Sequence, residues 1–304
     1  MVSDLTIIVL TFNEEDNIRR CLDSIKGITD KILVVDSGST DKTLDILQEY
    51  KVEILSHPFD NYSQQRNWAQ VNNPFNTEWV FHLDAGECFS SELKRWILED
   101  FDPLADYDGY MFCRRMIFLG RWIKHGGQYP IYHMRLFKAD KGKCEEKVYD
   151  QHYILDGKKY VVKKGIDLID YMISDLRSFT IKHNKWAIME AAETIMIGET
   201  GDVKASIGGN PIEKRRWLKN NVFQKVPLFL RSFLYFNYRY FLCLGFLDGK
   251  EGLVCHFLQG FWFRFMVDAT IHELRLTMDD NITLADALYK LYDFDINKLI
   301  YNNN

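Results

Sequence analysis

The sequence contains little proline and no closely paired cysteines. Its 304 residues include 6 prolines and 18 glycines, too few for a disordered, collagenous or low-complexity chain. The 6 cysteines are scattered without a Cys-x-x-Cys pair, so zinc-finger spacing is absent and a secreted disulfide scaffold is not expected. We therefore expect a globular protein of the reducing cytoplasm.

An excess of positive charge is also missing. The formal net charge is -5, which excludes a chain that binds nucleic acid through overall basicity. The N-terminal segment MVSDLTIIVLTFNEE has no basic region and no small-residue cleavage site, so it indicates a first strand rather than a signal peptide. Hydrophobic residues make up 47% of the chain, and a chain of this length can bury a core without a disulfide or a metal to hold it.

The first 84 residues alternate between short apolar strands and helices. Leu5–Leu10 is a continuous apolar run, as expected for a strand buried on both faces of a parallel sheet. Further strands are predicted over 32–35, 52–55 and 78–83, and helices over 40–50 and 63–71 as well as after the first strand. Such a βαβα series predicts an α/β fold with a mostly parallel sheet flanked by helices.

Polar clusters follow three of these strands. They are Asn13-Glu14, the run from Asp36 to Asp41, and the run from Asp84 to Glu87. Ligands of open α/β sheets bind beyond the carboxyl ends of the strands. Helix capping would explain any single cluster, and Asn13 in particular is a good cap for the helix that follows it. Three clusters at one edge favour a binding site.

The second half of the chain has a different character. A helix is predicted over 178–198, and Val203–Tyr240 carries eight basic residues against one acid. Two apolar, aromatic segments follow, over 228–247 and 253–267. We therefore expect two domains: residues 1–175, which form the α/β domain, and residues 176–304, which are mainly helical.

The motifs resemble a known family. VLTFNEEDNIRRCLDSI, ILVVDSGSTDKT, SQQRNWA and WVFHLDAGE are similar to segments of the inverting family 2 glycosyltransferases, which have the Rossmann-like GT-A fold. FLGRWIKHGGQYPIYHMRLFKAD and LGFLDGKEGL resemble the subgroup that adds glucose to the inner core of lipopolysaccharide, and the similarity extends to about residue 268. The resemblance implies transfer of a hexose, glucose from UDP-glucose, to a lipid-linked or lipopolysaccharide-type glycan.

The resemblance also implies a site for the nucleotide sugar. Its residues here would be Thr11, Asn13, Glu14, Asp36, Ser37, Gly38, Arg66, Asp84 and Arg135. Asp36 would accept hydrogen bonds from the uracil or ribose. Helix capping is an equally good explanation for Asn13 and Glu14, and an exposed helical arginine is an equally good explanation for Arg66.

A departure from the family pattern affects the metal site. The family signature Asp-Ala-Asp-Glu is here Asp84-Ala85-Gly86-Glu87, so the carboxylate that usually lies nearest the metal is replaced by a glycine. Asp84 and Glu87 remain as ligands for Mg²⁺ or Mn²⁺, which prefer oxygen. Three alternatives stay open: a weaker metal site, cationic side chains in its place, or a catalytically impaired module that binds a nucleotide sugar or a partner protein.

An inverting transfer needs a base on the face of the sugar opposite the leaving group. The subgroup has Val-His-Glu after its Arg-Leu-Phe segment, and this chain has Val148-Tyr149-Asp150. The resemblance therefore makes Asp150 the candidate base, with Glu146 as the reserve. The alternative for Asp150 is a solvated acid in a loop.

The apolar segments of the second half suggest a membrane surface. Leu228–Leu247 is long enough to span a bilayer, but Arg231, Asn237 and Arg239 lie within it, and a central arginine is costly there. We expect a helix in the membrane interface, with the basic residues upstream facing anionic headgroups at the cytoplasmic side. The alternative is an ordinary aromatic core beside a solvated basic face.

Overall fold

The computed structural model of the chain describes residues 1–147, 149–172, 175–196, 203 and 205–296. These residues form two compact units. The first comprises Met1–Lys124, Gln128–Glu145 and His152–Ser174, and the second comprises His125–Gly127, Glu146–Gln151 and Asp175–Asn304. Two short segments of the second unit therefore come from within the sequence of the first.

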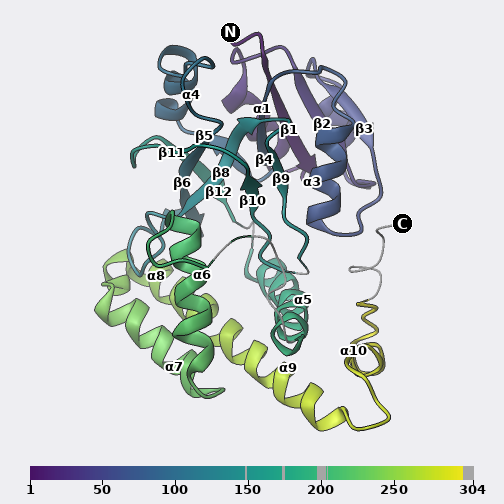
Figure 1. The fold of residues 1–304 in the computed structure, drawn as a ribbon, viewed down its shortest axis with the longest axis vertical. Helices are drawn as coiled ribbons and strands as arrows, with labels where there is room; N and C mark the ends of the chain where they lie inside the picture. The colour runs from purple at the N-terminus through teal and green to yellow at the C-terminus, as the bar shows by residue number, and fades with distance from the viewer. Residues whose placement is uncertain (148, 173–174, 197–202, 204, 297–304) are drawn as a thin grey trace. The chain divides into compact units, whose positions relative to one another are not determined.

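The first unit contains a mixed sheet whose first half is parallel. Its strands are β1 (Leu5–Thr11), β2 (Ile32–Asp36), β3 (Glu53–Ser56) and β4 (Trp79–Asp84), in the spatial order β3-β2-β1-β4. All residues of β1 and β2 are buried, which agrees with the apolar runs that predicted them. Figure 1 shows these strands together with the helices that connect them.

The sheet continues with strands of mixed direction. They are β8 (Tyr132–Lys138), β6 (Gly109–Phe118), β12 (Asp167–Tyr171) and β5 (Glu87–Phe89), in that order after β4, with β7 (Arg121–Trp122) and β11 (Lys159–Val161) pairing with β6. β8 runs antiparallel to β4 and to β6, whereas β12 runs parallel to β6. β9 (Gly142–Cys144) and β10 (Tyr153–Leu155) form a separate antiparallel pair.

Four helices accompany the sheet. They are α1 (Ile18–Ile25), α2 (Thr43–Leu47), α3 (Tyr62–Val71) and α4 (Ser91–Glu99). α1 buries Ile18, Cys21, Leu22 and Ile25, the helical spacing that the sequence shows. Trp79, Phe81 and Phe112 are fully buried in the core. The predicted α/β fold, with its mostly parallel sheet and flanking helices, is therefore confirmed.

The second unit is helical in its described part. Its α-helices are α5 (Leu176–Ile195), α6 (Pro211–Asn221), α7 (Leu230–Asn237), α8 (Gly249–His256), α9 (Phe263–Thr277) and α10 (Leu284–Tyr292). Short 3-10 turns occur at η1 (Phe223–Lys225) and η3 (Gly245–Asp248), and π-helical turns at η2 (Tyr238–Leu242) and η4 (Phe257–Trp262). Residue 198, where the sequence predicted the end of the helix that begins at residue 178, lies outside the described residues.

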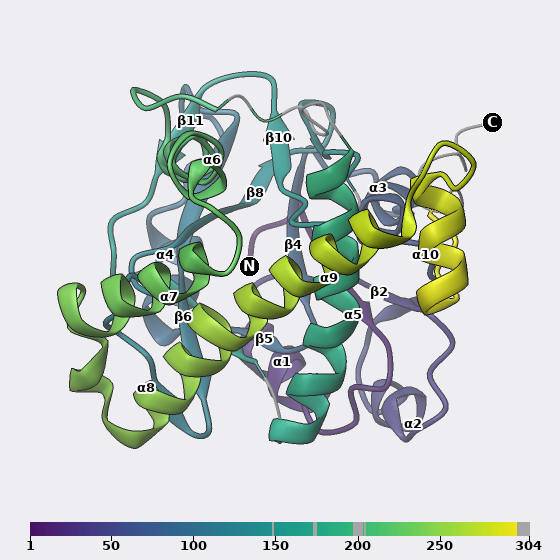
Figure 2. The same cartoon turned by 90° about the horizontal axis from the view of Figure 1, so that it is seen from below.

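A small apolar core holds the helices of this unit together. Helix α9 crosses α5 (Figure 2). Their facing residues include Ala187 and Ala191 on α5 and Val267 and Ile271 on α9, all buried in one cluster. The alanines let the two helix backbones approach closely. Within the described residues, no helix combines the length and the apolar character that crossing a membrane would require.

Candidate active site

The register of the first unit brings the predicted polar residues to one edge of the sheet. Thr11 pairs with Asp36 of β2, and its neighbour Leu10 pairs with Asp84 of β4. The strands are parallel, so the turns that follow β1, β2 and β4 all leave from the same edge. The convergence that the sequence pattern predicted is therefore present in the backbone.

The turn after β2 is shaped by Asp36. One carboxylate oxygen of Asp36 accepts hydrogen bonds from the backbone N–H groups of Gly38 and Ser39, both at 2.9 Å, and the other accepts from the Ser39 hydroxyl at 2.5 Å. Gly38 has a φ of +91°, which favours glycine. Ser37 accepts a hydrogen bond from the Gln65 side chain at 3.0 Å. Asp36 is only 2% exposed, so in this structure its carboxylate serves the loop.

Asn13 does not cap the first helix, and that prediction was wrong. Asn13 has a φ of +53°, and its side-chain oxygen accepts from the backbone N–H of Thr40 at 2.8 Å. The cap position of α1 is Asn17, which makes no side-chain cap bond. Asn13 instead connects the turn after β1 to the turn after β2. The two residues are 27 positions apart, so the local sequence pattern gives no sign of this hydrogen bond.

Glu14, the next residue, also connects the turn after β1 to the segment that follows β2. Its backbone N–H donates to the Thr43 hydroxyl at 2.8 Å, and its side chain accepts from the Asn17 amide at 2.7 Å. The first two loops of the site are thus held together by side chains before any ligand arrives. A preorganised loop loses less entropy when it binds.

Asp84 lies between two arginines. Nη2 of Arg66 is 3.3 Å from both carboxylate oxygens of Asp84, and Nη2 of Arg135 is 3.4 Å from Oδ2. The arginine side chains are 11% and 6% exposed, whereas Asp84 is 39% exposed. Burial alone would raise the pKa of Asp84, but the two guanidinium groups hold it well below its usual range. The alternative of an exposed helical arginine at Arg66 does not hold.

Glu87 occupies the inner side of this cluster. Its Oε1 lies 2.5 Å from Nη2 of Arg135, and its Oε2 accepts from the backbone N–H of Asp84 at 3.1 Å. Burial raises the pKa of Glu87 to about 7, although Arg135 opposes the shift. Nearby, Asp170 pairs with Arg114 at 3.2 Å, and burial raises the pKa of Asp170.

The donor set does not fit a metal site built by the protein. Glu87 uses both of its oxygens, Asp84 faces two cations, and Gly86 supplies no side chain. Among the residues that the structure describes, no group of three His, Cys, Asp or Glu side chains could hold a metal ion. Positive charge at this edge comes from Arg66 and Arg135, the cationic alternative that the sequence left open.

Several buried polar atoms in this cluster lack a partner within the described chain. They are Nε of Arg66, Nε of Arg135 and the hydroxyl of Tyr153. Unpaired buried donors are costly and call for an explanation. An oxygen-rich anionic ligand would supply the missing acceptors.

The sequence reasoning missed two tyrosines of this site. The rings of Tyr62 and Tyr153 each lie 5.4 Å from the Arg66 guanidinium carbon. Tyr62 precedes Arg66 by four residues on α3, so helical spacing would have revealed it. Tyr153 comes from β10, 87 positions further along the chain than Arg66, and carries no such signal.

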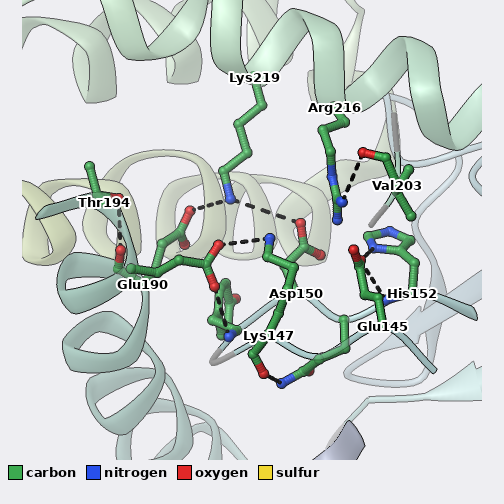
Figure 3. Close-up of polar contacts among 12 residues, drawn as sticks. Glu145, Lys147, Asp150, His152, Glu190, Thr194, Val203, Arg216 and Lys219 are labelled. Carbon is green, nitrogen blue, oxygen red and sulfur yellow. Dashed lines mark hydrogen bonds and ion pairs between the residues drawn. The ribbon is translucent and has the colours of Figure 1, made fainter. Parts of the chain in front are cut away.

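The candidate bases lie in the second unit. Asp150 is 46% exposed, with a φ of +56°, and its carboxylate is 3.9 Å from Nζ of Lys219 (Figure 3). Lys219 also pairs with Glu190 at 3.0 Å, and Glu190 pairs with Arg264 at 2.7 Å. Glu146 is exposed. Val148, which begins the predicted motif, lies outside the described residues.

Burial and charge act in opposite directions on the acids of this network, and burial raises the pKa of Glu193. Glu190 is buried, which would raise its pKa, but Arg264 and Lys219 lower it. Lys147 pairs with Glu193 at 2.7 Å, and Glu193 accepts from the backbone N–H of Tyr149 at 2.9 Å. The loop that carries Asp150 is thus anchored to Glu193 of α5 through two residues that precede Asp150.

Comparison with known proteins agrees with this geometry. Residues 6–154 match the family model described as glycosyl transferase family 2. The chain therefore carries a family 2 glycosyltransferase domain. This domain includes all of the predicted donor-site residues as well as Glu146 and Asp150, and the α/β unit is its GT-A type fold.

Relatives of the glycosyltransferase domain are found among bacterial proteins. An uncharacterized glycosyltransferase of Rickettsia typhi is 36% identical over 93 residues, which cover 30% of each chain. The lipopolysaccharide core biosynthesis glycosyltransferase LpsC of Rhizobium meliloti is 24% identical over 265 residues, covering 84% of this chain and 89% of LpsC. The match to the Rickettsia relatives thus spans about a third of their length.

A solved structure also resembles the chain. TarS of S. aureus (residues 1–349), in complex with UDP-GlcNAc, is 13% identical with a TM-score of 0.46, and the match covers 93% of this chain and 95% of that one.

Proposed function

We propose that the protein is an inverting glycosyltransferase that moves a hexose, glucose from UDP-glucose, to a lipid-linked or lipopolysaccharide-type glycan. The observation that carries this proposal is the pair of buried arginines, Arg66 and Arg135, which converge on Asp84 at the carboxyl edge of the parallel strands. A nucleotide-sugar donor carries a diphosphate, and this edge offers cations and unpaired donors for it.

The arginines suit the chemistry of the leaving group. When the bond between the sugar C1 and the diphosphate oxygen breaks, negative charge grows on the UDP that leaves. Preorganised cations and N–H donors at that position stabilise the transition state more than the ground state. A guanidinium can donate two parallel bonds to phosphate oxygens. Asp84 fixes the direction of both guanidinium groups, and this role requires no metal ion.

The transfer also requires removal of a proton. The acceptor hydroxyl oxygen attacks C1 from the side opposite to the diphosphate, and its proton passes to a base within hydrogen-bond reach. We propose Asp150 for this base, with Glu146 as the reserve. Its ion pair with Lys219 and the anchoring of its loop support the choice, because both limit the movement of the carboxylate.

A glycolipid acceptor accounts for the likeness to LpsC, whose name assigns it to lipopolysaccharide core biosynthesis. Such an acceptor lies in a membrane. We therefore propose that the protein acts at the cytoplasmic face of the membrane and contacts its surface.

A screen of nucleotide sugars tests the donor site. A donor present at 100 times its dissociation constant adds about 2.7 kcal/mol to the unfolding free energy, which a melting experiment detects. We expect UDP-glucose and UDP to raise Tm, with no requirement for a divalent cation. If no nucleotide or nucleotide sugar raises Tm, the donor site is refuted.

A second candidate function is favoured by Gly86, which removes the carboxylate that the family usually has. It is a catalytically impaired GT-A module that binds a nucleotide sugar without transfer. A UDP-release assay separates the two functions, because the impaired module would bind the donor but release no UDP when membrane glycolipid extract is added as acceptor.

A further inference from the structure

Exposed apolar side chains cover one face of the helical unit. On α7 and the turn that follows it, they are Leu230, Phe233, Leu234, Tyr238, Phe241 and Leu242, between 47% and 76% exposed. Their spacing of three and four residues places them along one side of a helix. All six side chains are open to solvent.

A second row of exposed side chains lies beside the first. It consists of Phe246, Leu247, Leu253, Phe257 and Phe265, between 39% and 50% exposed. Ring contacts connect the two rows through intervening aromatic side chains: Tyr240 lies 5.1 Å from Phe241 of the first row and 6.3 Å from Phe246 of the second. Phe236 lies 6.1 Å from Phe257, and Phe229 lies 5.2 Å from Phe265. The two rows thus form one continuous surface, here named the aromatic face.

The arginines of these segments point away from the aromatic face. Arg231 is 4% exposed, and its Nε donates to Asp268 at 2.6 Å. Arg239 is 5% exposed, and its Nε donates to the backbone oxygen of Gly126 at 3.0 Å. The sequence suggested that these charges interrupt the apolar segment. The structure shows that both arginines are buried on the inner side of the helices, although Nη2 of Arg239 has no partner within the described chain. Their charges therefore do not oppose burial of the outer side in an apolar medium.

A contiguous patch of exposed apolar side chains marks an interaction site on a protein surface. Its composition of Phe, Leu and Tyr is typical of side chains that enter the boundary between headgroups and acyl chains. The helices and turns of the same unit also carry exposed basic residues: Lys214, Arg215, Lys225 and Lys250. Each contributes about 1 kcal/mol when it lies near an anionic lipid surface.

The charges near the aromatic face favour a lipid bilayer over a protein as its binding partner. The aromatic face itself has no acid, and the nearby acid Asp248 is 3% exposed and bonded to His125 at 2.7 Å. An apolar area accompanied by cations complements an anionic bilayer, which requires no matched shape. A protein partner would need polar groups paired at the rim. On α6, η1 and α8 the exposed charges are all basic, whereas Glu213 and Glu251 are half-buried.

We propose that the aromatic face is a membrane-binding surface that enters the interface of an anionic phospholipid bilayer. In this arrangement α7 lies parallel to the membrane plane, and Arg231 and Arg239 stay inside the protein. The use of this surface for a glycolipid acceptor rests on the proposed function, whereas lipid binding itself does not depend on transfer.

Vesicle flotation of the full chain tests the surface. We expect flotation with vesicles of phosphatidylcholine and phosphatidylglycerol and little with phosphatidylcholine alone. The bound fraction should fall as salt rises from about 0.05 to about 0.5 M, because the screening length shortens several-fold. Leu242→Ser should weaken binding about tenfold, since it removes one large apolar side chain from the surface.

A matched control is available in the same unit. Leu276 is 74% exposed and Leu242 is 76% exposed, but Leu276 lies near the end of α9, outside the aromatic face. Leu276→Ser should bind vesicles as the unsubstituted protein does. Equal weakening by both substitutions, or no flotation with anionic vesicles at low salt, would overturn the proposal.

A second measurement distinguishes lipid from a second copy of the chain. Light scattering after size exclusion should show one species over a range of concentrations. A dimer that Leu242→Ser dissociates would assign the aromatic face to self-association and overturn the proposal. The Tm shift with UDP-glucose should persist in Leu242→Ser, so failure of lipid binding is distinguishable from failure of the donor site.

Discussion

Nη2 of Arg135 lies 2.5 Å from Oε1 of Glu87, and the two side chains are 6% and 3% exposed. A buried pair of this kind fixes the guanidinium strongly, because separating the charges would leave one of them buried without a partner. The same nitrogen lies 3.4 Å from Asp84. The acids of the altered metal signature therefore position an arginine, and the site keeps a cation where the family pattern leads one to expect a metal.

Arg66→Gln tests the role of the second arginine. We expect the rate of UDP release to fall about 100-fold or more, because a preorganised donor to a developing oxyanion contributes about 10²–10³ to kcat. Arg66→Lys should recover part of the rate, since it restores the charge but not the planar fork. Measuring the rate of UDP release and the Tm of each variant separates an effect on catalysis from an effect on stability.

The matched control is Arg19→Gln. Arg19 also pairs with an acid, Glu49 at 2.7 Å, but both side chains are about half exposed. Such surface pairs contribute about 0–1 kcal/mol, so UDP release should stay unchanged. Equal losses in the two variants would mean that Arg66 acts only through the fold.

Gly86→Asp tests whether the missing acid can be restored. Among the described residues, a Cβ at Gly86 would meet only the Tyr171 backbone oxygen, at 3.6 Å, and the φ of Gly86 is not positive. The chain should therefore tolerate a side chain there. We expect Mn²⁺ to tighten UDP binding to the Gly86→Asp variant at least tenfold, measured by titration calorimetry with and without EDTA. Gly86→Asn fills the same space without the charge and should show no metal dependence.

The sequence predicted the edge of the sheet better than the contacts made there. Strand ends can be read from apolar runs, so the positions of Asp36 and Asp84 followed from local pattern and sheet topology. Their partners could not, because Arg135 lies 51 residues from Asp84 and such pairings depend on the whole fold. For the same reason, the bond from Asn13 to Thr40 was not foreseen. The bonds from Asp36 to Gly38 and Ser39 are local, and they were not foreseen because Asp36 was assigned to a ligand instead.

The helical unit shows a similar limit. Composition predicted two apolar helical segments, but it could not tell which side of each helix carries the charges. In the sequence Arg231 interrupts an apolar run, and the direction of its side chain is set by Asp268, which is 37 residues away. A helical wheel of α7 alone would not have revealed this partner.

Asp150→Asn tests the proposed base. Asparagine adopts the left-handed conformation readily, so the φ of +56° at this position is kept without the strain that alanine would introduce. We expect UDP-sugar binding to persist and transfer to an acceptor to fall about 100-fold or more, as expected for loss of general base catalysis. Donor binding by calorimetry and transfer with radiolabelled glucose give the two quantities.

Glu146→Gln is the companion variant for this experiment, because it changes the reserve base in the same loop. Transfer within a factor of about three of the original rate in Asp150→Asn, together with a large loss in Glu146→Gln, would move the role to Glu146.

His82 makes stability depend on pH. The ring is 1% exposed, and its Nε2 lies 3.1 Å from the Gln70 side-chain oxygen. Burial lowers the pKa of His82 to about 3, helped by Arg66 and Arg135. In the unfolded chain the pKa is about 6.5, so the contribution to stability is complete above that value and is lost as pH falls toward 3. Between pH 7.5 and 5 the unfolded state gains a proton on His82 that the folded state does not, which lowers the unfolding free energy by about 2 kcal/mol.

Glu87, whose folded pKa is raised, contributes with the opposite sign over about pH 4.5 to 7, so the pH dependence of the unfolding free energy combines several groups. The comparison with His82→Phe isolates one of them: urea unfolding at both pH values should show that this variant loses about 2 kcal/mol less than the unsubstituted protein on acidification. His272→Phe, at an exposed histidine of α9, is the control and should follow the unsubstituted protein. If acidification destabilises His82→Phe and the unsubstituted protein equally, His82 is not held neutral by the fold.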